Sequence, residues 1–145
     1  MTNNTILLVE DDPDEERLAL VAFKQSGIRD QVVVARDGQE AIDYLLAQGV
    51  HTNRATNDLP RVVFLDINLP KINGIDVLKR VRSNKATSLL PVVLLTSSDE
   101  KCDREEGYRC GANSFVRKAH DFDEFIANIH DLSKYWLGLN HTAYE

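Results

Sequence analysis

The stretch Arg61-Val62-Val63-Phe64-Leu65-Asp66 decides the fold, because it is an apolar run that ends abruptly in a carboxylate. A short uninterrupted apolar run is typical of a parallel strand that is buried on both faces of a sheet. An aspartate directly after such a strand projects into the crevice at the carboxyl edge, where open α/β sheets bind ligands. Asp66 is therefore the first candidate for a functional residue.

Four other short apolar runs alternate with longer amphipathic stretches, a pattern that predicts βα units around a parallel sheet. Three of these runs also lead into reactive side chains: Glu10-Asp11, Thr96 and Lys118. If the strands are adjacent and parallel, carboxylates, a hydroxyl and an ammonium converge beside Asp66, a set that suits a divalent cation and a phosphoryl group. The predicted strands are 5–9, 31–35, 61–65, 91–95 and 114–116.

The predicted helices begin at recognisable capping residues. Asp12 precedes a proline at the first helical position, and Asp37 and Asp121 stand three residues before a glutamate, the spacing of a capping box. Glycines mark the expected helix ends. The expected N-caps are Asp12, Asp37, Asn73, Ser97 and Asp121, and the expected stops are Gly27, Gly49 and Gly111.

Two further segments carry structural expectations. Residues 50–59 are polar and aperiodic, which predicts a loop at the edge of the sheet opposite the acidic crevice. The helical spacing after Asp121 predicts a last helix to about residue 137, followed by a frayed tail over 139–145. Apolar residues beyond the core predict an exposed interface patch and a homodimer on the face of the fourth helix, fifth strand and fifth helix, with Trp136 near the contact. The alternative is a tail that folds back on its own chain.

Composition bounds the function. The chain has 145 residues, which predicts one domain. Its net charge of -6 argues against binding to nucleic acid or to an anionic membrane surface. No apolar run approaches the roughly 20 residues of a membrane span, and the polar N-terminus lacks the features of a signal peptide. Cys102 and Cys110 match no metal or redox spacing, so a cytoplasmic protein with reduced thiols is expected.

Five motifs together resemble the receiver domain of two-component response regulators over about residues 4–130. The resemblance implies a flavodoxin-like, doubly wound, five-stranded parallel sheet of order 2-1-3-4-5 with helices on both faces. It also implies one receiver domain over 1–145, with a helical extension and tail over about 131–145. The motifs are Leu8–Asp11, Phe64–Pro70 with Gly74, Leu94–Ser98, Gly111-Ala112 and Phe115–Lys118.

The resemblance implies a role for each residue at the predicted crevice. Asp66 is the expected phosphoacceptor and nucleophile, while Lys118 and Thr96 meet the phosphoryl oxygens. Thr96 and Phe115 are the expected switch residues. Phe115 has no hydroxyl, so its movement would be a packing event.

A cation is needed beside this nucleophile, because a lone carboxylate repels an incoming phosphoryl group. The resemblance implies Mg²⁺, with Mn²⁺ as a substitute, held directly by Asp11 and Asp66. Glu10 would bind it at least through water, and Asn68 through its backbone carbonyl. Ala119 follows Lys118 where the family usually has proline, and the sequence leaves a cis or trans bond open.

The expected function is that of a stand-alone phosphoacceptor switch rather than an enzyme acting on other substrates. A sensor histidine kinase is the expected partner. The long loop and extended last helix resemble small regulators paired with bacterial phytochromes. Three alternatives remain. A haloacid-dehalogenase-like phosphatase would need a second aspartate at Asn68, and an FMN binder a Gly-, Ser- and Thr-rich loop after the first strand. The third is a receiver-like module that is never phosphorylated.

Overall fold

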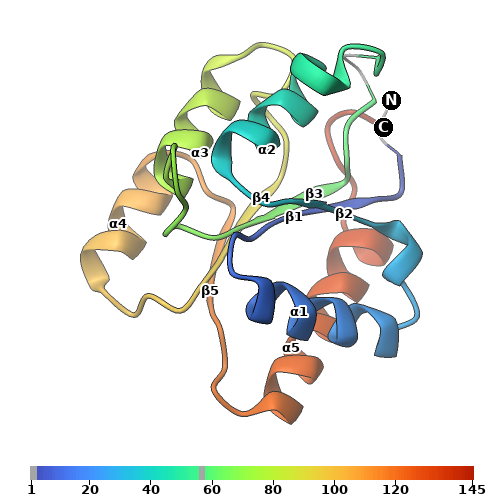
Figure 1. Ribbon diagram of the computed structural model, residues 1–145, viewed down its shortest axis with the longest axis vertical. Helices are drawn as coiled ribbons and strands as arrows, with labels where there is room; N and C mark the ends of the chain where they lie inside the picture. Colours follow the sequence, from blue (N-terminus) through green and yellow to red (C-terminus); the bar gives the residue numbers. More distant parts are fainter. Residues whose placement is uncertain (1–2, 56–57) are drawn as a thin grey trace.

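The protein, seen here as a computed structural model, is a parallel sheet with helices on both faces (Figure 1). The structure describes residues 3–55 and 58–145. The strand order β2-β1-β3-β4-β5 confirms the predicted flavodoxin-like topology. The strands are β1 (Ile6–Val9), β2 (Val32–Ala35), β3 (Val62–Leu65), β4 (Val92–Thr96) and β5 (Ser114–Arg117). The helices are α1 (Pro13–Gln25), α2 (Gly38–Leu45), α3 (Gly74–Ser83), α4 (Lys101–Arg109) and α5 (Phe122–Lys134).

Alternate residues of the central strands face opposite cores, as the period of two in a strand requires. One face, which we name the α2–α3 core, joins Leu7 and Leu65 to Ile42 and Leu78 of the helices. The other face, the α1–α5 core, contains Ile6, Leu8, Phe64, Phe23, Phe125 and Ile129. Figure 1 shows α2 and α3 on one side of the sheet and α1 and α5 on the other. Both faces are covered, so β1 and β3 are apolar throughout, and β4 is apolar up to Thr96 at its carboxyl end.

Four of the predicted N-caps are confirmed, and one is wrong. The side chains of Asp12, Asp37, Asn73 and Asp121 each accept a backbone N–H in the first turn of the helix that follows. Ser97 does not start α4, which begins three residues later with Glu100 as N-cap and no side-chain cap. The Ser98 hydroxyl instead donates to Asp103 at 2.5 Å, so this segment is a β4–α4 loop.

Two of the three predicted helix stops are confirmed. Gly27 and Gly111 follow α1 and α4 with φ of 78° and 102°, in the left-handed region that favours glycine. The second helix ends earlier than expected, at Leu45. Ala47 already has a positive φ of 53°, so the chain leaves the helix before Gly49.

The loop between α2 and β3 lies at the amino edge of the sheet, as predicted. It begins with a short 3-10 turn, Gly49–His51, and returns at Leu59, whose carbonyl accepts the Asn3 N–H at 2.9 Å. Residues 56 and 57 of this predicted loop lie outside the described residues. Among the residues described, no helix is both long and apolar enough to cross a bilayer.

The prediction of a frayed tail is wrong. After α5, a π-helical turn (Tyr135–Leu139) extends the helix slightly beyond its predicted end. The tail then crosses the amino edge of the sheet, where Glu145 pairs with Arg61 at 3.1 Å. The Tyr144 hydroxyl accepts the Leu89 N–H at 2.9 Å. These contacts correspond to the alternative in which the tail folds back on its own chain.

Trp136, expected near an interface, is instead a core residue. Its side chain is 9% exposed and packs in the α1–α5 core. Leu137 is partly buried against the same core. The exposed large apolar side chains at this end of the described chain are Tyr135 and Leu139, so a patch centred on Trp136 does not exist on this surface.

Candidate phosphoacceptor site

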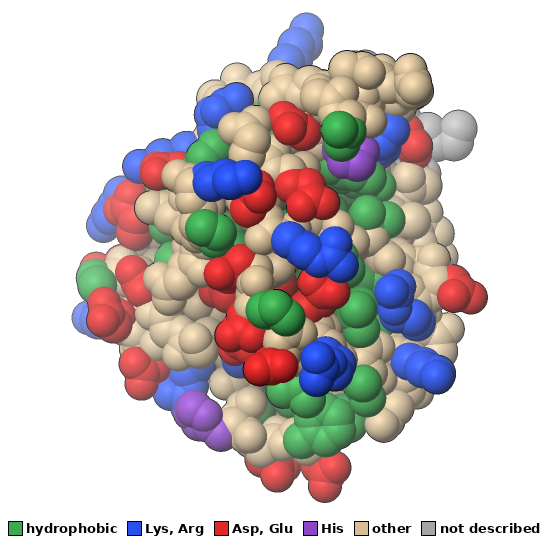
Figure 2. All heavy atoms as spheres, in the orientation of Figure 1, with side chains coloured by type: hydrophobic (Ala, Val, Ile, Leu, Met, Phe, Trp, Pro, Cys, Tyr) green, Lys and Arg blue, Asp and Glu red, His purple; other side chains and the backbone are tan. Residues whose placement is uncertain are grey.

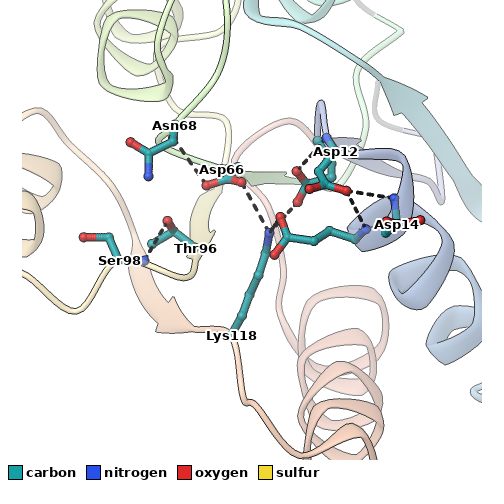
Figure 3. Close-up of polar contacts among 9 residues, drawn as sticks. Asp12, Asp14, Asp66, Asn68, Thr96, Ser98 and Lys118 are labelled. Carbon is teal, nitrogen blue, oxygen red and sulfur yellow. Dashed lines mark hydrogen bonds and ion pairs between the residues drawn. The ribbon is translucent and has the colours of Figure 1, made fainter.

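The site lies at the carboxyl ends of four neighbouring strands (Figure 3). Glu10 follows β1, Asp66 follows β3, Thr96 ends β4, and Lys118 follows β5. The strands are parallel, so these ends meet at one edge of the sheet, which is why residues far apart in the sequence converge. Glu10, Asp66 and Thr96 are 2%, 5% and 0% exposed, which removes their polar groups almost entirely from water.

Gly74 keeps the β3–α3 connection close to Asp66. Its N–H donates to the Ile67 carbonyl at 2.7 Å. A Cβ placed on Gly74 would lie 2.0 Å from the Asp66 carbonyl oxygen, which is a severe steric clash with the backbone. Any side chain here would push α3 away from the end of β3, so glycine is required for the loop that carries Asp66.

The Lys118 ammonium is the centre of the site. It forms a close ion pair with Glu10 and lies 3.3 Å from the Asp66 Oδ2 and 3.4 Å from the Glu15 Oε2. An ammonium has three N–H donors, so three carboxylates can satisfy it completely. The Lys118 side chain is 11% exposed, and its backbone N–H donates to the Thr96 carbonyl at 2.7 Å, which fixes its start beside β4.

Burial and charge pull the ionisation of this cluster in opposite directions. Burial raises the pKa of Glu10 to about 7, and the nearby Asp66 charge adds to the rise, while the Lys118 contact lowers it. Burial alone would lower the pKa of Lys118, but the carboxylates of Asp66, Glu10 and Glu15 together raise it. Lys118 therefore stays charged. The contact with Lys118 does not offset the effect of burial on Glu10, so the pKa of Glu10 stays raised.

Asp66 and Thr96 keep reactive atoms available. One Asp66 oxygen contacts Lys118, and the other accepts the Asn68 N–H at 3.4 Å, at the long end for a hydrogen bond. The Thr96 hydroxyl accepts the Ser98 N–H at 3.2 Å, which leaves its own proton free to donate. Phe115 is partly buried against the α2–α3 core. The described peptide bonds include no cis bond, so the Lys118-Ala119 bond is trans.

The donor set fits a hard divalent cation. Oxygen atoms of Glu10, Glu15 and Asp66 lie within 4.8 Å of one another, and carboxylate oxygens are the ligands that Mg²⁺ and Mn²⁺ prefer. The raised pKa of Glu10 shows that Lys118 alone does not compensate the buried charge. The structure places Asp11 beside this group but exposed, and its carboxylate is not among the converging oxygens.

Glu15 is the functional candidate that sequence reasoning missed. Its position in the first turn of α1 suggested only a favourable charge at a helix N-terminus. It stands three residues after the N-cap Asp12, so a capping box would aim its carboxylate at the Asp12 N–H. That N–H donates to Glu10 at 3.2 Å instead, and the Glu15 carboxylate pairs with Lys118. The capping-box spacing, with a competing acid beside it, was the only signal in the sequence.

Acidic groups also surround the mouth of the site. Figure 2 shows acidic side chains gathered in the middle of the face seen there, near the start of α1, with basic side chains around them on both sides. Asp12 caps α1 there, accepting the N–H groups of Asp14 and Glu15 at 2.8 and 3.3 Å. An incoming phosphoryl group would meet a negative field at this edge unless a cation offset it.

Comparisons with known proteins agree with this geometry. The family profile described as "Response regulator receiver domain" matches residues 6–130. The probable methanogenesis regulatory protein FilR2 of Methanothrix harundinacea is 35% identical over 138 residues, which cover 94% of this chain and 86% of that protein. Response regulator Rcp1 of Synechocystis is 32% identical over 132 residues, which cover 91% of this chain and 88% of that protein.

Solved structures match over nearly the whole chain. A phosphorylated cyanobacterial phytochrome response regulator, RcpA, superposes with a TM-score of 0.87 at 30% identity, covering 96% of this chain and 97% of that one. The Mn²⁺-bound form of Rcp1 gives a TM-score of 0.85 at 30% identity, covering 95% and 97%.

Proposed function

Because the chain belongs to the response-regulator receiver family, we propose that Asp66 accepts a phosphoryl group from a sensor histidine kinase. The observation that carries the proposal is the position of Lys118, whose ammonium lies against both Asp66 and Glu10 at the buried carboxyl edge of the sheet. A cation held beside a nucleophilic carboxylate and a second acid is the arrangement that phosphoryl transfer requires.

The chemistry assigns one step to each side chain. A carboxylate oxygen of Asp66 attacks phosphorus, and the P–N bond of the donor phosphohistidine breaks. The bonding electrons stay on the imidazole, which leaves as the neutral ring because its other nitrogen is already protonated. Lys118 turns from Asp66 and Glu10 to a phosphoryl oxygen, and the Thr96 hydroxyl donates a hydrogen bond to another phosphoryl oxygen. Both side chains start at the same edge of the sheet as Asp66, so the proposed transfer needs a change of side-chain partners and no movement of a strand.

We propose that Mg²⁺, or Mn²⁺ in its place, is held by Asp11 and Asp66, with Glu10 binding at least through water and the Asn68 backbone carbonyl as a further ligand. The ion would supply the positive charge that lets a dianionic phosphoryl group approach the acids at this edge, which are Glu10, Asp11, Glu15 and Asp66. Support comes from the convergence of carboxylate oxygens of Glu10 and Asp66, two of the proposed ligands, and from the Mn²⁺-bound structure of the relative Rcp1. Asp11 must turn inward to take part, which its exposed position allows.

The signal is proposed to pass through Thr96 and Phe115. If Thr96 turns toward the phosphoryl group, the space beside it changes, and the half-buried Phe115 ring is the neighbouring apolar group that can move into it. Phe115 lies near α4, since a Cβ on Gly107 would be 3.8 Å from its ring. The surface of α4, β5 and α5 is therefore the proposed output, read by another protein.

We further propose a single-domain regulator, with a receiver core over about 4–130 and a packed extension over 131–145. It would be cytoplasmic, with Cys102 and Cys110 as free thiols. A phytochrome-linked kinase is the proposed partner, supported by the structural likeness to the cyanobacterial phytochrome response regulator RcpA. FilR2 is named as a probable methanogenesis regulatory protein, so a kinase without a phytochrome is the alternative partner.

A homodimer remains part of the proposal, but Trp136 is not its contact. Its support is the exposure of Tyr108 on α4 and Tyr135 after α5, which are 51% and 47% exposed. Large exposed aromatic side chains are common at interfaces. Phosphorylation would then shift the dimer equilibrium through the nearby switch residues.

The kinase assignment is tested by phosphotransfer profiling. Purified kinases with phytochrome and with unrelated sensors are autophosphorylated with labelled ATP, then mixed briefly with this protein and Mg²⁺. Label should move within seconds from one phytochrome-linked kinase to the wild-type protein and not to Asp66→Asn. Transfer from unrelated kinases alone would contradict the phytochrome link and leave the phosphoacceptor role intact.

A further inference from the structure

Glu15 is the one member of the buried ion cluster that has no place in the proposed chemistry. Its Oε2 lies 3.4 Å from the Lys118 ammonium, and its side chain is 37% exposed at the start of α1. Asp66 is expected to carry the phosphoryl group, and Glu10 to turn to the cation. Of the three carboxylates that pair with Lys118 in the described part of the chain, Glu15 is therefore the one that can stay bound to it throughout the reaction.

The local structure holds Glu15 in this position. Pro13 begins α1, and Asp12 caps it, so Glu15 has a fixed backbone in the first turn. The Glu10 carboxylate takes the Asp12 N–H that would otherwise attract Glu15. With that partner occupied, the nearest described cation to Glu15 is Lys118, which is itself confined between β5 and the other two acids.

We propose that Glu15 is a positioning residue that holds Lys118 in the resting arrangement and competes with the phosphoryl group for its ammonium. This inference rests on the proposed phosphoacceptor function and adds a regulatory element to the same site. The Lys118 donors satisfied by Glu10 and Asp66 are released when those acids change partners. The Lys118 N–H that donates to Glu15 is not released. The contact between Lys118 and the phosphoryl group therefore has to compete with the Glu15–Lys118 ion pair.

The direction of the effect follows from charge. Replacing Glu15 with glutamine removes the competing charge and one negative charge beside the phosphoryl dianion. The phosphorylated form should then reach a higher occupancy and last longer. Glu15 is partly solvated, which limits the strength of its pair, so the expected change is between about two- and fivefold.

The test compares Glu15→Gln with Asp14→Asn, which removes the same charge one residue earlier. The Asp14 side chain is 84% exposed and its ion pair is with Arg17 at 3.8 Å, away from Lys118. Each protein is incubated with acetyl phosphate and Mg²⁺, and intact mass gives the phosphorylated fraction and its decay after the donor is removed. We expect the longer lifetime in Glu15→Gln and wild-type behaviour in Asp14→Asn.

Two further measurements separate positioning from other roles. If Glu15 acts through Lys118, its substitution should have no effect in a Lys118→Ala background, as a double-mutant cycle requires. The Mg²⁺ affinity of Glu15→Gln should stay within about twofold of wild type, because an outer charge shifts binding far less than the loss of a ligand. A persistent effect without Lys118, or a loss of Mg²⁺ affinity of tenfold or more, would overturn the positioning role.

A fourth readout does not depend on phosphorylation. In ¹⁵N NMR spectra of the unphosphorylated protein, the Lys118 ammonium should exchange slowly with water in wild type and Asp14→Asn and faster in Glu15→Gln. Equal lifetimes and equal exchange in wild type and Glu15→Gln would overturn the inference alone. A wild-type protein that takes up no phosphoryl group would overturn the proposed function instead.

Discussion

The Lys118 ammonium lies 3.3 Å from the Asp66 carboxylate although the two residues are 52 positions apart. The contact joins the ends of β3 and β5, which are separated in the sheet by β4. It forms because every strand runs in the same direction, so that each delivers its following residue to one edge. The site is thus a property of the topology, and changes in the sheet edge or its loops should alter the chemistry.

The metal role predicts a specific loss in Asp11→Ala. Removing this acid should weaken Mg²⁺ binding by at least about tenfold, as the loss of a group around a metal commonly does, and should slow phosphorylation by acetyl phosphate accordingly. Isothermal titration with Mg²⁺ measures the binding, with Asp14→Asn as the control. Wild-type metal affinity in Asp11→Ala, or full phosphorylation in excess EDTA, would contradict the assignment of Asp11.

Gly74→Ala should damage the site through the backbone. The added methyl group would meet the Asp66 carbonyl oxygen, and such overpacking costs about 1–3 kcal/mol of stability. Gly138→Ala is the matched control, because a Cβ there meets nothing within 4 Å. Urea unfolding should show a clear loss for Gly74→Ala and little change or a small gain for Gly138→Ala. Equal stability of the two variants would show that the β3–α3 loop can move aside.

Asp37→Ala should destabilise the protein in a pH-dependent way. The backbone N–H of Glu40, with help from Lys71, lowers the pKa of the Asp37 carboxyl, and loss of such a cap costs about 1 kcal/mol. A lowered folded-state pKa gives stability that is present above the ordinary carboxyl pKa of about 4 and is lost as pH falls through the folded value. The difference between Asp37→Ala and wild type should therefore shrink below pH 4.

The control for this cap is Asp30→Ala, since Asp30 is exposed and its side chain makes no hydrogen bond or ion pair within the described residues. Its unfolding free energy should follow wild type across the pH range. If the loss of unfolding free energy in Asp37→Ala stays constant between pH 3 and pH 7, the cap does not depend on the charge of Asp37.

Substitutions at Trp136 and Tyr135 distinguish a role in core packing from a role in dimer formation. Trp136→Ala removes a buried aromatic side chain and should cost about 3–5 kcal/mol of stability. Tyr135→Ala removes a half-exposed ring that packs edge-on against Trp136, with 5.0 Å between the ring centroids. It should cost about 1 kcal/mol of monomer stability, less than Trp136→Ala, while weakening a dimer. Urea unfolding and sedimentation of both variants, with and without acetyl phosphate, provide the measurement. Monomers in every sample at high micromolar concentration would contradict the homodimer.

Much of the architecture was predictable from local patterns. The strands and the caps Asp12, Asp37, Asn73 and Asp121 follow from apolar runs and short polar side chains before helices, which are local signals. Ser97 was misplaced because Ser98 bonds the side chain of Asp103, so the helix starts only after the loop has closed on itself.

The remaining errors have a common physical cause, since each depends on contacts distant in the sequence. The tail is ordered by Arg61 and Leu89, which no tail residue reveals. Trp136 is buried because α5 continues through a π-helical turn and keeps the ring on the α1–α5 core. Glu15 reaches Lys118 only once the sheet brings β5 beside the start of α1. Apart from the capping-box spacing at Glu15, spacing along the chain gives no sign of these contacts.

The most direct test of the account is intact-mass measurement of wild type and Asp66→Asn after incubation with acetyl phosphate and Mg²⁺. Asp76→Asn serves as the control, because Asp76 is also an acid in the β3–α3 region but lies exposed on α3. The account predicts one added phosphoryl group in wild type and Asp76→Asn, and none in Asp66→Asn or in EDTA. An unmodified wild-type protein, or equal labelling of Asp66→Asn, would contradict it.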